Sequence, residues 1–73
     1  MIGMNNPKLS RKAAWLINAL RVQVILEKLD SDEVEKLVEL ILDSNVKTVD
    51  ELQKFIKKQM SDEARKLIPE FFK

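Results

Sequence analysis

The chain contains no cysteine, no histidine and no tyrosine among its 73 residues. Without cysteine there are no disulfides or thiolate metal ligands, and without histidine there are no His-based catalytic triads. The lone glycine, Gly3, excludes a glycine-rich phosphate-binding loop. We therefore expect no enzymatic activity, no cofactor, no metal site and no small-molecule substrate.

Long apolar runs are also missing. None reaches the ~18 residues of a membrane-spanning helix, and the most apolar stretch, residues 12–26, is interrupted by Asn18, Arg21 and Gln23. The first ten residues, MIGMNNPKLS, lack the apolar region of a signal peptide. We expect no membrane contact, and the lack of cysteine fits a cytoplasmic location.

With one glycine and two prolines, the chain has few turn-forming residues, and no segment alternates long enough to indicate a strand. Hydrophobic residues at 45% and charged residues at 34% are typical of a folded domain. The sequence predicts an all-α fold, a small bundle of one long first helix and three shorter ones. Because so short a chain buries only a small core, we further expect assembly as a homodimer.

The predicted domain organisation is an N-terminal tail over residues 1–6 and a single helical domain over 7–73. Its helices are expected at about 7–28, 31–44, 49–59 and 62–72. Pro69 interrupts the apolar periodicity of the last helix, because proline lacks the backbone donor and clashes with the preceding turn. The helix should either stop or kink there, and the periodicity that continues to Phe72 favours a kink.

Capping residues mark the predicted helix ends. The first helix has two candidate N-caps, Asn6 followed by Pro7, and Ser10, whereas the other three begin after Asp30, Thr48 and Ser61. In LDSDEV and KTVDEL a glutamate three residues after the cap, Glu33 or Glu51, predicts a capping box. Asn45 is expected to end the second helix in the left-handed conformation.

The first predicted helix has two apolar faces on a helical wheel. One face holds Ala13, Ile17, Leu20 and Val24, with Leu16 at its edge; the other holds Trp15, Ala19, Val22, Leu26 and Leu29. A helix that joins a core needs one such face. The second face is therefore covered either by the other helices of the bundle or by a partner. We favour the partner and take Trp15, Ala19, Val22 and Leu26 as its candidate interface residues.

Charge is unevenly distributed along the chain. Residues 1–28 are net basic, residues 29–51 net acidic and residues 52–73 net basic, within a total of +1. Glu35, Glu39 and Asp43 follow a four-residue spacing that places them on one helix face. The simplest expectation is that this acidic row faces solvent or that oppositely charged helices lie side by side in the bundle.

Two functions follow from these patterns. The first is a non-enzymatic protein-interaction or regulatory module that binds itself, another protein, or both. The alternative is a small helix-turn-helix-like nucleic-acid-binding protein, with the turn at KQMSD and Lys8, Arg11 and Lys12 as possible anion contacts. Cations at a helix start oppose the helix dipole, so local stability does not account for them. The near-neutral total favours the first function.

Overall fold

The computed structural model describes residues 6–72, so most of the predicted tail, residues 1–5, and Lys73 lie outside the described part. The described chain forms α1 (Pro7–Ile25), α2 (Ser31–Asp43), α3 (Val49–Gln59), the short α4 (Asp62–Arg65) and a 3-10 helix, η1 (Pro69–Phe72). No strand occurs within residues 6–72, which confirms the all-α class.

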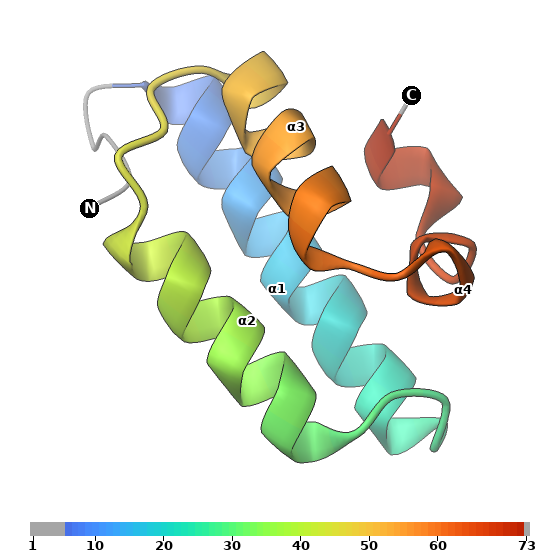
Figure 1. Ribbon diagram of the computed structural model, residues 1–73. Helices are drawn as coiled ribbons and strands as arrows, with labels where there is room; N and C mark the ends of the chain where they lie inside the picture. Colours follow the sequence, from blue (N-terminus) through green and yellow to red (C-terminus); the bar gives the residue numbers. More distant parts are fainter. Residues whose placement is uncertain (1–5, 73) are drawn as a thin grey trace.

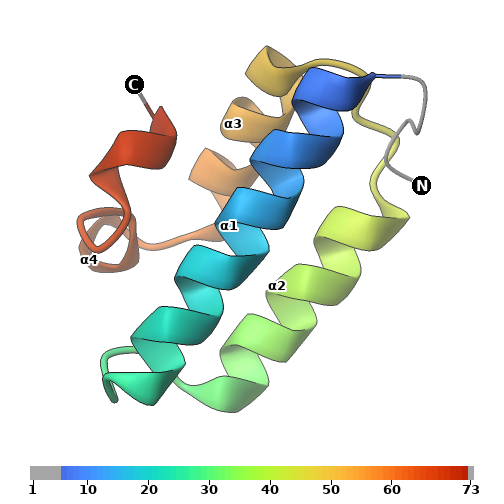
Figure 2. The ribbon, with the colours of Figure 1, turned by 180° about the vertical axis from the view of Figure 1, so that it is seen from behind.

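The other two long helices, α2 and α3, pack against α1. Helices α1 and α2 run antiparallel as a hairpin, and α3 lies along the N-terminal half of α1 (Figure 1). The α4–η1 segment lies on the side of α1 away from α2, as the view from behind shows (Figure 2). In that view no other element lies in front of α1, so one long face of this helix is not covered by the rest of the fold.

The core is built from one face of each longer helix and from the C-terminal segment. Its fully or nearly fully buried side chains are Leu9, Ala13, Leu16, Leu20, Val34, Leu37, Val38, Ile41, Leu52, Ile56, Met60, Ile68 and Phe71. Four of these belong to α1 and recur every three or four residues, as a single buried helix face requires. Ser44 is also buried, and its hydroxyl donates to the Ile41 carbonyl oxygen at 2.7 Å.

The predicted N-caps are confirmed, and Asn6 rather than Ser10 caps α1. The side chains of Asn6, Asp30, Thr48 and Ser61 accept hydrogen bonds from the backbone N–H groups of Leu9, Asp32, Glu51 and Ala64 at 3.1–3.3 Å. These bonds satisfy donors that lack a partner in the first helical turn. Asn6 also donates from Nδ2 to the Lys47 carbonyl oxygen at 3.1 Å, which links the start of α1 to the α2–α3 connection.

The capping boxes are not formed as predicted. The Glu51 carboxylate accepts from the backbone N–H of Lys47 at 2.9 Å, one residue before the expected partner Thr48. Within residues 6–72, Glu33 makes no hydrogen bond to Asp30. Asn45 is not left-handed either, since α2 ends at Asp43 and Ser44 takes an extended backbone.

Helix α1 ends earlier than the predicted residue 28. It stops at Ile25, and Glu27 has a positive φ of 61°. This left-handed residue lets the N–H of Lys28 donate back to the Gln23 carbonyl oxygen at 2.9 Å, which closes the helix end. Glycine is the usual residue here, so the missing glycine removed the signal that would have placed this boundary.

The predicted last helix stops before Pro69, so the alternative of a stop holds and the favoured kink is wrong. Helix α4 stops at Arg65, and tighter turns follow, with Ile68 N–H donating to the Arg65 carbonyl oxygen at 3.2 Å. Pro69, which has no N–H to continue the α-helix, then begins η1. The apolar residues of this segment still pack into the core: Ile68 and Phe71 are buried although no continuous helix joins them.

Candidate interaction surface

The two predicted faces of α1 have different surroundings. Of the first face, Ala13, Leu16 and Leu20 are buried, while Ile17 and Val24 are half-buried against the core. The second face is only partly covered: Trp15 is 41% exposed, Val22 48% and Leu26 55%, while Ala19 is half-buried. We call Trp15, Ala19, Val22 and Leu26 the outer strip.

The C-terminal segment covers one end of the outer strip. The rings of Trp15 and Phe71 are nearly parallel, with an interplanar angle of 10° and centroids 6.3 Å apart. The Lys12 ammonium lies 5.8 Å from the Trp15 ring centroid and 5.2 Å from that of Phe71. Stacking and cation–π attraction hold the indole in one position. This contact joins residues far apart in the sequence, so no local pattern predicted it.

An apolar groove of about 440 Å³ runs beside the middle of the strip. Its lining comprises Trp15, Asn18, Ala19, Val22 and Gln23 from α1, and residues 67–70 from the C-terminal segment. One polar atom in the groove wall lacks a partner: the Oε1 of Gln23 is buried and accepts no hydrogen bond among residues 6–72. A groove with apolar walls at a helix face is a common form of protein-binding site.

Sequence reasoning missed Ile25, which is 78% exposed at the end of α1. The helical wheel did carry a signal, because Ile25 lies opposite the core face. Together with Val22 and Leu26 it forms an exposed apolar end to α1. Such contiguous apolar surface is characteristic of interaction sites.

The three basic candidates lie together at the other end of α1. Lys8, Arg11 and Lys12 line a second groove, of about 530 Å³, with Trp15, Val49 and Glu70. We call this the basic groove. Trp15 and Glu70 line both grooves, so the basic groove continues into the apolar one. The structure therefore joins both sets of candidate residues into one surface along α1.

The acidic residues of α2 are not paired with α1. Within residues 6–72 the ion pairs are Lys54–Asp50, at 3.2 Å, and Arg65–Asp62, and each lies within one helix. The acidic row is exposed to solvent, as in the simplest expectation. In the same part of the chain no cluster of potential metal ligands occurs. Within the described residues, α1 and α2 therefore form no ion pair with each other.

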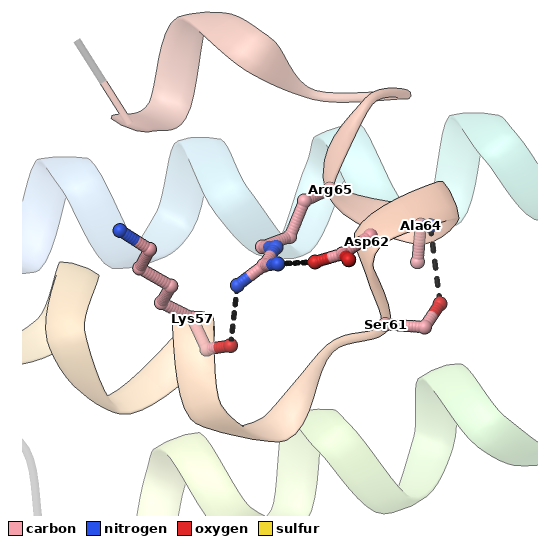
Figure 3. Close-up of polar contacts among 5 residues, drawn as sticks. All are labelled: Lys57, Ser61, Asp62, Ala64 and Arg65. Carbon is pink, nitrogen blue, oxygen red and sulfur yellow. Dashed lines mark hydrogen bonds and ion pairs between the residues drawn. The ribbon is translucent and has the colours of Figure 1, made fainter.

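The helix that follows the predicted KQMSD turn is too short for a helix-turn-helix arrangement. Helix α4 has only four residues, and its one cation, Arg65, is engaged within the chain. Its guanidinium donates to the Lys57 carbonyl oxygen at 2.9 Å and pairs with Asp62 (Figure 3). A single turn is too short to present several side chains along a DNA groove.

Comparison of the chain with known protein families, with curated proteins and with solved structures found no match. No helix in the described part of the chain combines the length and the apolar character that crossing a bilayer requires.

Proposed function

We propose that this protein is a small, non-enzymatic interaction module that acts in the cytoplasm and binds through the outer strip of α1, with a second copy of itself as its first partner. The observation that carries the proposal is the exposure of the strip. Trp15, Val22 and Leu26 remain 41–55% exposed next to an apolar groove. Aromatic and aliphatic side chains in such a position are typical anchors of buried interfaces.

The size of the protein supports the same proposal. A chain of 73 residues without disulfides has a small core, and the described fold leaves large apolar side chains of α1 in solvent. A partner that covers this strip removes apolar surface from water and so adds stability that the monomer lacks. Another protein that binds the outer strip would compete with self-association, and this competition is how the module would regulate that protein.

The experiment is Val22→Asp, followed by sedimentation equilibrium and by Trp15 fluorescence. We expect self-association to weaken roughly a hundredfold or more, because the variant buries an unpaired carboxylate in an apolar interface. The wild-type emission should shift to shorter wavelengths as concentration rises, since Trp15, the only tryptophan, becomes covered. Val22→Asp should abolish that shift while the helical circular dichroism is kept.

Leu42→Asp is the matched control. Leu42 is 51% exposed on α2, so the substitution places the same charge at a similarly exposed apolar position away from the strip. It should leave self-association unchanged. Dissociation by Leu42→Asp but not by Val22→Asp would move the interface to α2 and refute the proposed surface.

Nucleic-acid binding is the second candidate, and the basic groove is the observation that favours it. Three cations there adjoin the half-exposed indole of Trp15, and single-stranded nucleic acids bind to cationic grooves with aromatic stacking platforms. Its test is titration with single-stranded DNA over a range of salt concentrations. Binding that falls steeply with salt, and is lost when Lys8, Arg11 and Lys12 are all changed to alanine, would favour this function.

A further inference from the structure

The start of α1 carries charges of the sign that its own dipole disfavours. Its first turns hold Lys8, Arg11 and Lys12 and no acidic residue, and its last turn holds no basic residue. The positive end of a helix dipole lies at its N-terminus and the negative end at its C-terminus. The three cations therefore oppose the stability of the isolated helix.

Nothing else within residues 6–72 neutralises these charges by an ion pair. Lys12 rests on the rings of Trp15 and Phe71, and the single acid of the basic groove, Glu70, forms no ion pair there. At the far end, the α1–α2 connection and the first turn of α2 bring four exposed acids together with one cation, Lys28. We call Glu27, Asp30, Asp32 and Glu33 the acidic connection.

The basic and acidic ends lie at opposite ends of one continuous surface. Lys8, Trp15 and Val22 recur every seven residues, so they follow one line along α1. The 19 residues of α1 extend about 28 Å, against a longest dimension of 34 Å for the described protein. Figure 2 shows the start of α1 and the α1–α2 connection at the two ends of the uncovered face. The outer strip runs along the edge of this face, beside the C-terminal segment, and it too has charges of opposite sign at its two ends.

We propose that two copies pair antiparallel along their outer strips, about a two-fold axis near the middle of the strip. This inference rests on the proposed function and specifies its geometry. Aligning the strips in this way places Trp15 opposite Leu26 of the partner subunit and Ala19 opposite Val22 of the partner subunit. The basic groove of each copy then extends past the end of the partner's α1, onto the partner's acidic connection.

Charge complementarity selects this arrangement over a parallel one. A parallel pair would place basic groove on basic groove and acidic connection on acidic connection, and juxtaposed like charges oppose binding. The antiparallel pair matches opposite charges at both ends at once, as a two-fold interface repeats each contact. It also brings acidic residues of the partner subunit next to the cations at the start of α1.

The test is a charge exchange between the two ends. One variant carries Lys8→Glu and Arg11→Glu, and the other carries Glu27→Lys and Asp32→Lys; Lys12 and the cap Asp30 are kept because they hold local structure. Each variant alone should dimerise at least roughly tenfold more weakly. An equimolar mixture should form the heterodimer at close to wild-type affinity, because both ends of that pair are again complementary.

Native mass spectrometry separates the heterodimer from the homodimers by mass, and sedimentation equilibrium gives the affinities. The chain with all four substitutions should again form a homodimer. Circular dichroism should show that both variants remain helical. The new acids at the start of α1 favour its dipole, and the single cation that Asp32→Lys adds to the first turn of α2 disfavours the dipole of that helix too weakly to unfold it.

The outcomes separate this inference from the proposed function. If both variants dissociate and the mixture does not restore the dimer, antiparallel pairing is wrong. If neither variant weakens a dimer that Val22→Asp dissociates, the interface on the strip stands and the antiparallel arrangement is overturned. A wild-type protein that stays monomeric at high concentration overturns both.

Discussion

The core face and the outer strip of α1 are made of similar residues but are buried to different extents. Leu16 and Leu20 are fully buried in the core, whereas Val22 and Leu26, a few residues further along the chain, are about half exposed. The difference lies in what packs on each side. Two long helices cover the core face, but only the irregular segment after α4 and the short η1 approach the strip. An apolar helix face is suited to burial, but it is buried only where another element of the fold packs against it.

The largest expected difference between the faces is in folding stability. Leu20→Ala should lower the free energy of unfolding by about 2–5 kcal/mol, because it leaves a cavity in the core. Val22→Ala, its matched control on the strip, should cost less than about 1 kcal/mol in the monomer. Urea unfolding followed by circular dichroism at low protein concentration measures both. Equal costs at that concentration would show that the two faces belong to one core.

Trp15→Ala tests the border between the faces, where the C-terminal segment packs on the strip. We expect a loss of about 1–2 kcal/mol in the free energy of unfolding, from the lost stacking on Phe71 and the lost cation–π contact with Lys12. Lys12→Gln removes only the second contact and should cost less than about 1 kcal/mol. Thermal unfolding followed by circular dichroism compares the two variants. A loss for Trp15→Ala no larger than that for Lys12→Gln would show that the stack adds nothing.

Gln23→Met gives the smallest expected effect on the free energy of unfolding, and it should raise this free energy where the preceding variants lower it. It removes the buried Oε1 that lacks a hydrogen-bond partner in the described chain, so stability should rise by up to about 1 kcal/mol. Gln59→Met changes an exposed glutamine at the end of α3 and should have no measurable effect. Urea unfolding of the two variants provides the comparison. A loss of stability in Gln23→Met would mean that the Gln23 amide has a structural role in the groove wall.

Much of the fold was predictable because it depends on local chemistry. Three of the four caps were named without ambiguity, since a side-chain oxygen next to free backbone N–H groups acts within one helical turn. The core face of α1 followed from three- and four-residue spacing. The failures were also local in origin. Glu27 took a conformation usual for glycine, and the periodicity beyond Pro69 came from a packed 3-10 helix and not from a continuous α-helix.

The candidate surface was predictable only in its parts. Lys8, Arg11 and Lys12 were identified as one group, and Trp15, Ala19, Val22 and Leu26 as another. That the two groups form one continuous surface depends on where Phe71, Glu70 and Val49 lie, and these residues are distant in the sequence. No periodicity within α1 contains that information.

By itself the sequence determined the helical class, most helix starts, the core face of α1 and the separation of charge along the chain, because caps, periodicity and charge act over a few residues. Only the tertiary structure decided that the outer strip stays half exposed, that two grooves meet at Trp15, and that the charges of α1 and α2 are not paired with each other. Those features depend on which elements pack on α1, and packing joins residues that are far apart in the chain.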